Sequence, residues 1–585
     1  MPKIDPDTLV NTLTSYRAEA ETARNSGWGQ RDDVWRSNTD LYFNRFDFSG
    51  KADWQSKQAM PEASLYIDRW AAALRSALVV PGVWYSVESH MTELEPAFRK
   101  FLGYWLDRCG TAPTGYNVGF DRVFEDQTKL AALMACAASV TWEPAKGGGG
   151  RVRVDTVDPR EILLDPTNRG LYRVRRSECD FYQLMAEAKA NPDLYNMDEI
   201  ERLSAARSQE METERMELVG HDTGISSARR PIVRDEYLAV ILDEEGKDIY
   251  DEKQLCIVAN SNYLIRGPEA NPFMHDRDWI VFSPAISVPL SVYGKTYVET
   301  WGDIARTFVE LTNLIIDAGM MSSMNAFYIQ ADMLEDPEQA ASGIFPNKLF
   351  VGAPGGSAKQ FIETIQLGTL STATVNAWTA IKQEMREGAA TNDMDLGQSV
   401  PKGDVTAYEI SEVRAGGAAL IQSIAASLET GCVDPILNLV FQTALQHAFA
   451  DVTVDENGQY VVPPAVEPLR VALGEEYFGM FVTRWQDFLR LAPVFRARGI
   501  SGLIERGQKL KAMLQVLQAM GSSPIMQQAL LQSIGFTKFV RQMVILVGLD
   551  PNDFPPDQIS QMATQQQMMP PGGGNGAQLG AIANA

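Results

Sequence analysis

Cysteine and histidine, which most often build disulfides and metal sites, are scarce in this sequence. Its 585 residues include five cysteines and four histidines. They are Cys109, Cys136, Cys179, Cys256 and Cys432, and His90, His221, His275 and His447. Because no two cysteines have CxxC spacing, the sequence predicts neither a disulfide framework nor a zinc site, and it indicates no cofactor. We expect the thiols to be ordinary buried or half-buried side chains.

Long hydrophobic runs are also missing. A membrane-spanning helix needs ~18 consecutive apolar residues, and the longer candidates, residues 131–138 and 543–547, are much shorter. The first residues, Met1–Asp5, lack the apolar stretch of a secretory signal. The sequence therefore predicts a protein that folds in the cytoplasm and has no membrane partner.

The motifs of common catalytic sites are absent as well. The sequence contains no GxSxG, HExxH or GxxxxGKS/T segment, which argues against serine hydrolase, zinc protease and ATPase activity. Two carboxylate pairs remain, Asp393 with Asp395 and Glu384 with Glu387. Such pairs are more often solvated than catalytic, so the sequence predicts that the protein is not an enzyme.

The charge is strongly acidic. The chain carries 75 acidic and 52 basic residues, a formal net charge of -23. Nucleic-acid affinity comes mainly from Lys and Arg, so tight or sequence-specific DNA binding is not expected. An acidic surface still suits a protein along which a duplex slides, because like charges do not hold each other; simple solubility is the alternative explanation.

Length and periodicity indicate an α+β chain, mainly helical, with more than one core, since single cores stop growing at roughly 300 residues. The spacing of apolar residues predicts helices over residues 5–24, 63–78, 96–108, 116–135, 178–217, 297–324, 371–387, 404–449 and 478–549. Strands are expected over residues 137–143, 151–157, 236–242, 254–258, 263–265, 279–282 and, around an Asn457-Gly458 turn, 451–473. Residues 231–288 have the pattern of a small separate β unit.

Four segments stand out in their order along the chain. They are the hairpin with Val140-Thr141-Trp142 and Val152–Asp158, the loop Asn271–His275, the segment Ser291–Lys295 before a long helix, and Val405–Ile410 after a glycine-containing loop. Taken together, from about residue 60 to 555, they resemble the portal, or head-tail connector, family of tailed bacteriophages. In that family Ser291–Lys295 would be the entry to the stem, and Val405–Ile410 would match a Thr-Ala-x-Glu motif that begins a long helix.

The resemblance implies a ring, usually a homododecamer, at one vertex of the capsid. Double-stranded DNA would pass through its channel non-specifically during DNA packaging and genome ejection. The implied partners are further copies of the chain, the terminase large subunit, a tail adaptor or head-completion protein, the scaffold and the major capsid protein. The localisation would be the virion, after assembly in the host cytoplasm.

The resemblance also implies a division into regions, which we give with their boundaries. They are a wing of helical and β-hairpin parts (1–195), a helical segment toward the first stem helix (196–228), a strand-rich clip (229–290), a stem helix (291–325), a second wing part (326–387), a tunnel loop (388–404), a long wing helix (405–450), returning strands and helix (451–495), a helical crown (496–556) and a disordered tail (557–585).

Candidate site residues follow from these regions. The tunnel-loop candidates, expected to line the channel, are Asn392, Asp393, Asp395, Gln398 and Lys402; the stem-helix entry is Tyr293, Gly294 and Lys295; the long-helix motif is Thr406, Ala407 and Glu409. An exposed loop far from any channel is the alternative for residues 388–404. Another head-completion or minor capsid protein, or a helical adaptor unrelated to phage, are the alternatives for the whole chain.

Overall fold

A computed structural model gives the structure of the chain. It describes residues 4–26, 30–78, 84–112, 115–145, 148–205, 231–242, 247–323, 325–329, 338, 351, 362–366, 371–389, 423–454, 460–491 and 493–498. Helices and strands are mixed, as the expected α+β class requires. The chain divides into two compact units, one of Met1–Arg75 with Val87–Val494 and one of Ser76–Ser86 with Phe495–Ala585.

Five helices dominate the first 133 residues, with short strands between them. They are α1 (Pro6–Asn25), α2 (Arg31–Tyr42), α3 (Glu62–Leu78), α4 (Glu95–Leu106) and α5 (Phe120–Leu133), with β2 (Gly110–Thr111) and β3 (Asn117–Val118) between α4 and α5. Asp5 caps α1 by accepting a hydrogen bond from the Thr8 amide at 3.2 Å. Four of these helices were predicted within a few residues. Helix α2 was not predicted, because most of its residues are polar and its sequence shows too few apolar residues for a clear helical period.

A five-stranded antiparallel sheet forms the first core of the larger unit. Its order is β10 (Tyr263–Ala270), β9 (Gln254–Ala259), β8 (Pro231–Ala239), β7 (Tyr172–Asp180) and β6 (Ile162–Leu164). Leu9 and Leu13 of α1 pack on one face against Val258. Helices α6 (Phe181–Ala190) and α7 (Met197–Ala205) cover the other face, where Leu184 and Ile257 share a core.

This sheet overturns two expectations. Residues 231–288 are not a separate β unit, because β8 pairs along its whole length with β7, from Tyr172↔Ala239 to Asp180↔Pro231. Residues 178–180, expected to begin a helix, are the end of strand β7, and helix α6 begins at Phe181. Backbone pairing with β8 outweighs the helical pattern of residues 178–180, a tertiary contact that local periodicity does not contain.

A second sheet has the order β11 (Ile280–Ser283), β4 (Cys136–Pro144) and β5 (Gly150–Thr156). The predicted hairpin is confirmed, with Val140 opposite Val154. Strand β11 pairs with β4 and not with the five-stranded sheet, and β12 (Ile286–Val288) belongs to a third sheet, so the expected clip region 229–290 contributes to three different sheets. Strands β8 and β11 pair with β7 and β4, which both come before residue 181.

One long helix, Ser423–Ala448, crosses this second core. It contains a π-helical turn, η6 (Glu429–Val433), followed by α14 (Asp434–Ala448). Among the described residues it is the one helix long and apolar enough to span a membrane, but 61% of its most apolar stretch is buried inside the fold. Its Phe441 contacts Phe98 and Phe101 of α4 at ring distances of 5.7 and 5.4 Å, which identifies it as a core helix.

The chain after the long helix returns to this core. Strands β16 (Thr453–Val454) and β17 (Tyr460–Val461) form the short hairpin that the Asn457-Gly458 pair predicted. Residues 467–473, however, are a helix, α15 (Glu467–Leu473), followed by α16 (Glu475–Leu491). Leu469 and Leu473 of α15 are four residues apart and both buried, so burial of one helical face decides for helix over strand.

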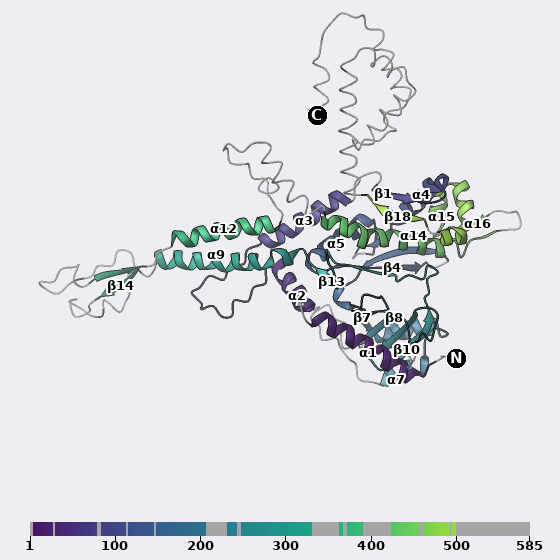
Figure 1. Cartoon of the computed structure of the whole chain (residues 1–585), viewed down its shortest axis with the longest axis horizontal. Helices are drawn as coiled ribbons and strands as arrows, with labels where there is room; N and C mark the ends of the chain where they lie inside the picture. The colour runs from purple at the N-terminus through teal and green to yellow at the C-terminus, as the bar shows by residue number, and fades with distance from the viewer. Residues whose placement is uncertain are drawn as a thin grey trace, which may run out of the picture. The chain divides into compact units, whose positions relative to one another are not determined.

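A helix pair completes the larger unit. Strands β12 (Ile286–Val288) and β13 (Ser291–Lys295) form a hairpin, and the chain then enters α9 (Gly302–Ser323) and β14 (Asn325–Ile329). It returns through β15 (Ile362–Gln366) and α12 (Thr372–Gly388). Strands β14 and β15 pair antiparallel, and α9 and α12 lie side by side in Figure 1. The helices predicted over residues 297–324 and 371–387 are thus confirmed.

The smaller unit is described only in part. Strand β18 (Val494–Ala497) pairs with β1 (Tyr85–Glu88), and both strands span the boundary between the units. The Arg498 amide donates to the Trp84 carbonyl at 2.8 Å. The rest of the expected crown, residues 499–556, and the expected tail lie outside the described residues.

Candidate functional site

The helix pair α9–α12 is held together by aromatic and polar contacts. Phe308 and Trp378 lie with their ring centroids 5.4 Å apart. The Trp378 Nε1 donates to Thr312 Oγ1 at 2.9 Å. Lys382 lies over the Trp378 ring at 5.1 Å and pairs with Glu62 of α3 at 3.3 Å. One face of each helix is thereby fixed against the other.

The base of the pair is a buried aromatic cluster. Tyr297 stacks on Trp70 of α3, with ring centroids 4.6 Å apart. Its hydroxyl donates to the Ala389 carbonyl, just beyond α12, at 2.5 Å. Trp301 packs against Tyr297 at 5.9 Å and is 1% exposed. The start of α9 and the end of α12 are therefore fixed to the same core.

A loop, residues 43–61, runs beside α9 and is attached to it by two buried polar residues. Asn313 donates to the Gln58 carbonyl at 2.9 Å and accepts from the Gln58 amide at 2.8 Å. Asp317 accepts from the Ser56 amide at 2.5 Å. Asn313 and Asp317 are four residues apart, so they face the same side of α9 and attach the loop there.

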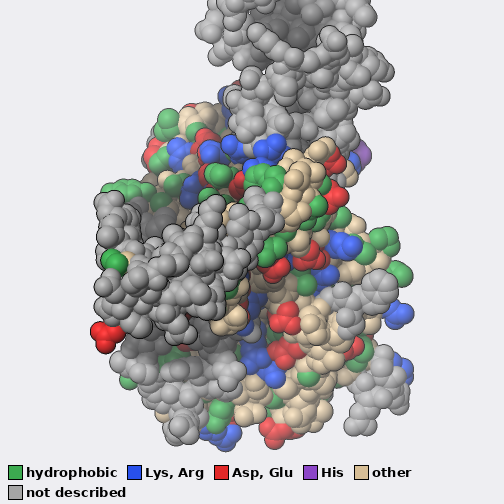
Figure 2. Space-filling view, turned by 90° about the vertical axis from the view of Figure 1, so that its left-hand side faces the viewer, with side chains coloured by type: hydrophobic (Ala, Val, Ile, Leu, Met, Phe, Trp, Pro, Cys, Tyr) green, Lys and Arg blue, Asp and Glu red, His purple; other side chains and the backbone are tan. Residues whose placement is uncertain are grey.

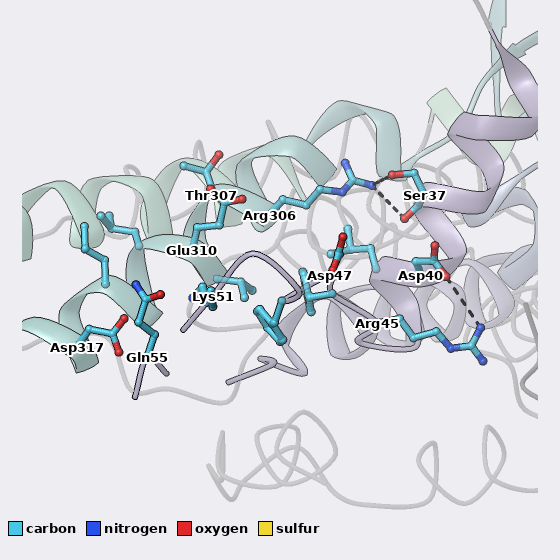
Figure 3. A pocket seen from close by; sticks show the side chains of 16 residues that line it. Ser37, Asp40, Arg45, Asp47, Lys51, Gln55, Arg306, Thr307, Glu310 and Asp317 are labelled. Atoms are coloured by element: carbon cyan, nitrogen blue, oxygen red, sulfur yellow. Dashed lines mark hydrogen bonds and ion pairs between the residues drawn. The ribbon is translucent and has the colours of Figure 1, made fainter. Parts of the chain in front are cut away.

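Between this loop, the end of α2 and α9 lies a cleft of about 680 Å³. Arg306 reaches across its rim and donates to the Ser37 hydroxyl at 2.6 Å, while Arg45 and Asp40 lie 3.9 Å apart (Figure 3). The lining mixes apolar residues with both charges: Leu41, Phe46, Phe48, Val309, Leu311 and Leu314, with Asp40, Asp47, Glu310, Asp317, Arg45, Lys51 and Arg306.

This lining does not indicate a catalytic or anion site. Four carboxylates face three cations in the cleft, and among the described residues no group of three His, Cys, Asp or Glu side chains could hold a metal ion. Seen from the side of the helix pair, acidic and basic side chains are intermixed over the coloured surface (Figure 2). A lining that mixes apolar residues with both charges is more typical of an interaction surface than of a catalytic site.

Both helices of the pair leave apolar side chains uncovered. Leu314, on the cleft side of α9, is 55% exposed, and Val375 of α12 is 37% exposed. The outward face of α12 is made largely of small residues, including Ala373, Ala377 and Ala380, all exposed.

The expected stem-helix entry is wrong in its local structure. Tyr293, Gly294 and Lys295 lie in strand β13, and α9 begins at Gly302. The Tyr293 hydroxyl accepts a hydrogen bond from the Leu164 amide at 3.0 Å, so this side chain joins β13 to β6. Gly294 has φ +56, and an added Cβ would lie 2.5 Å from the Ile286 carbonyl oxygen. The glycine therefore serves hairpin geometry and not helix entry.

The other candidates lie outside the described residues. They are the tunnel-loop candidates Asn392, Asp393, Asp395, Gln398 and Lys402 and the long-helix motif Thr406, Ala407 and Glu409. Two residues expected on a solvated helix face, Glu384 and Glu387, are exposed on α12.

The loop of Asn271–His275 packs on the C-terminal end of α14. The Gln446 side chain accepts from the Met274 amide at 2.9 Å and donates to the Pro272 carbonyl at 3.1 Å. His275 stacks on Phe273 at 5.2 Å. Burial, together with the positive charge of Arg277, lowers the pKa of His275 to about 4. His275 is thus a loop residue whose Nδ1 accepts a hydrogen bond from the Arg277 amide at 3.0 Å.

Comparisons with known proteins add no identification. No family model matches the chain, and no curated protein matches it.

The sequence did not reveal the cleft or the attachment of residues 43–61. The signal that could have indicated them is the pair Asn313 and Asp317 inside an otherwise apolar stretch of α9. Buried polar residues in a helix need partners, and here the partners come from a loop more than 250 residues earlier.

Proposed function

We propose that the chain is a portal subunit: a structural protein that assembles with copies of itself into a ring through which double-stranded DNA enters and leaves a phage capsid. The observation that carries the proposal is the excursion α9–β14 and β15–α12, two antiparallel helices anchored at one end and continued at the other by paired strands. The sequence resemblance and the net charge of -23 support it.

The excursion suggests a different division into regions from the one the sequence indicated. A clip lies between two stem helices, so it must be a segment that leaves the core and returns to it. Residues 229–290 do not fit, because β8 and β11 pair with β7 and β4 inside the core. We therefore assign the stem to α9 and α12, and the clip to the segment between them, which includes β14 and β15.

The uncovered faces of the pair support assembly with further copies. A closed ring of identical subunits needs heterologous contacts, in which one face of a subunit meets a different face of the next. The α9 face with Leu314 and the α12 face with Ala373, Ala377 and Ala380 are two such surfaces. Small residues let two helix backbones approach closely, so the second face suits a helical neighbour.

The ring is tested by measuring the mass of the purified full chain in solution and imaging it by negative-stain microscopy. We expect a closed ring with a central hole and a mass of about twelve subunits. A single-chain mass at micromolar concentration would overturn the proposal. An assembly without a central hole would favour another head-completion or minor capsid protein.

The surface is tested by a charged substitution on the uncovered face of α9. Leu314→Glu should leave the fold of the single chain intact, because the side chain is 55% exposed, but should prevent ring formation. Val471→Glu is the matched control, since Val471 is 76% exposed on α15. Normal rings from the Leu314 variant would remove the assigned interface.

The DNA-handling step needs a separate test. Deleting residues 393–400, within the expected tunnel loop, should leave ring assembly intact and reduce genome packaging or retention in an assembled particle. Normal packaging by this deletion would remove the loop from the mechanism without affecting the ring proposal. Nuclease and ATPase assays of the purified chain should both be negative.

A further inference from the structure

Two of the five thiols lie against each other in the second core. Cys136 and Cys432 are 1% and 0% exposed, respectively. The Cys136 thiol donates to the Gln127 carbonyl at 3.4 Å, and the Cys432 side chain lies next to it. For the remaining cysteines, Cys109, Cys179 and Cys256, no thiol is among the groups that act on the side chain.

The backbone around the two thiols explains their proximity. Cys136 begins β4 and is directly opposite Ser283 of β11. Gly431 of η6 lies against the same serine, so closely that an added Cβ would be 2.2 Å from Ser283 Oγ. Because Cys432 follows Gly431, the strand pair and the π-helical turn meet at this point.

The position of the pair along the chain makes a covalent link consequential. A bond there would join the first strand of the second sheet to the long helix Ser423–Ala448, across roughly 300 intervening residues. Cross-links that close long loops remove the most conformational freedom from the unfolded chain. The π-helical turn, a wider form of helix often found at functional positions, would be fixed in place.

We propose that Cys136 and Cys432 form an intramolecular disulfide when the folded chain meets an oxidising medium. The inference is independent of the portal proposal, since it concerns one chain and no partner.

The chemistry is thiol-disulfide exchange with a low-molecular-weight disulfide such as oxidised glutathione. One thiolate attacks that disulfide and releases one glutathione thiolate, which takes up a proton. The second thiolate attacks the mixed disulfide and releases the second glutathione. The protein loses two protons and two electrons, and the glutathione disulfide takes up both to become two thiols.

The same geometry predicts a slow reaction. The contact with Cys432 and burial raise the pKa of the Cys136 thiol, so little thiolate forms, and the oxidant reaches the pair only when the core opens locally. Cys179, which is half-buried, should therefore react sooner with an alkylating reagent than either member of the pair.

The test incubates the purified full chain with oxidised glutathione, blocks free thiols under denaturing conditions and maps the peptides by mass spectrometry. We expect a linked pair containing Cys136 and Cys432, lighter than the two free peptides by about 2 Da and separated by dithiothreitol. Finding all five thiols alkylated after prolonged oxidation, or Cys136 linked to another cysteine, would overturn the proposal.

A second measurement compares urea unfolding of oxidised and reduced samples. The oxidised wild type should unfold at a higher urea concentration, whereas Cys136→Ser should give one midpoint under both conditions. Cys256→Ser is the matched control, a buried thiol without a thiol neighbour, and should keep the wild-type difference. Equal midpoints for oxidised and reduced wild type would contradict the stabilising link. The peptide map of the wild type decides the question even if a variant fails to fold.

Discussion

The region that contains the five-stranded and three-stranded sheets differs from the α9–α12 pair in how fully its side chains are buried or paired within one chain. In the five-stranded sheet, both faces are covered by helices of the same chain, and even charged residues find partners inside it. Arg173 pairs with Glu236 at 2.8 Å and Asp278 at 2.7 Å. Burial alone would lower the pKa of this guanidinium, but the two carboxylates outweigh it and raise the pKa.

The helix pair is covered only in part by its own chain. Phe308, Trp378 and Thr312 make the contact between the two helices, and residues 43–61 attach to α9, while Leu314 and Val375 remain exposed. The sheets are therefore covered within one chain, whereas the helix pair leaves apolar side chains exposed to solvent.

The largest effect is expected in the aromatic core beside the second sheet. Phe101 is fully buried and touches Phe441, Phe449 and Phe481. Phe101→Ala should lower the free energy of unfolding by about 3–5 kcal/mol, because it removes buried area and leaves a cavity. Urea unfolding followed by tryptophan fluorescence measures it, and a loss under about 1 kcal/mol would show that this core is not the stable part.

A loss of folding stability at low pH should also arise in the sheet region, at His275. The unfolded chain binds a proton at His275 below about pH 6.5, whereas the folded chain does so only near pH 4. The free energy of unfolding should therefore fall as the pH drops through this window. We expect a loss of at most about 2 kcal/mol, after a discount because His275 is partly exposed.

His275→Asn should flatten that part of the pH profile, since an amide keeps an acceptor for the Arg277 amide but does not titrate. His90→Asn, at an exposed position, is the matched control and should retain the wild-type profile. The residues of α9 and α12 include no histidine. A profile unchanged by His275→Asn would assign the acid response elsewhere.

A smaller effect is expected inside the helix pair. Thr312→Val keeps the side-chain shape but removes the acceptor for Trp378 Nε1, so it should cost about 1 kcal/mol. Thr307→Val, on the exposed side of the same helix, should stay within about 0.5 kcal/mol of wild type. Equal effects of the two changes in urea unfolding would mean that the Thr312 contact does not hold the pair together.

The smallest effect in the single chain is expected at Leu314. Leu314→Ala should change the stability of the unassembled chain by less than about 0.5 kcal/mol, because more than half of the side chain is already exposed. Its effect should appear in the assembled state, as a lower thermal midpoint of the ring. A large loss in the single chain would indicate that the cleft closes over this residue within one subunit.

Local patterns predicted much of this fold because they report which face of an element is buried. The helix periods of residues 5–24 and 371–387 and the alternating hairpin of residues 137–157 were recovered nearly to the residue. Polar helix α2 and strand β7, whose last residues have a helical pattern, were missed. The stem entry was misplaced as well. Tyr293 and Gly294 lie in a hairpin strand whose geometry depends on contacts with β6 and β12.

The sequence by itself determined the class of elements, the acidic charge and the scarcity of chemistry-bearing residues, since composition and short-range periodicity carry this information. Only the tertiary structure decided that residues 231–270 join an earlier sheet, that Asn313 and Asp317 attach a loop to α9, and that Cys136 meets Cys432. These outcomes depend on contacts between residues far apart in the chain, and the free energy of burial that selects them is not a property of either segment alone.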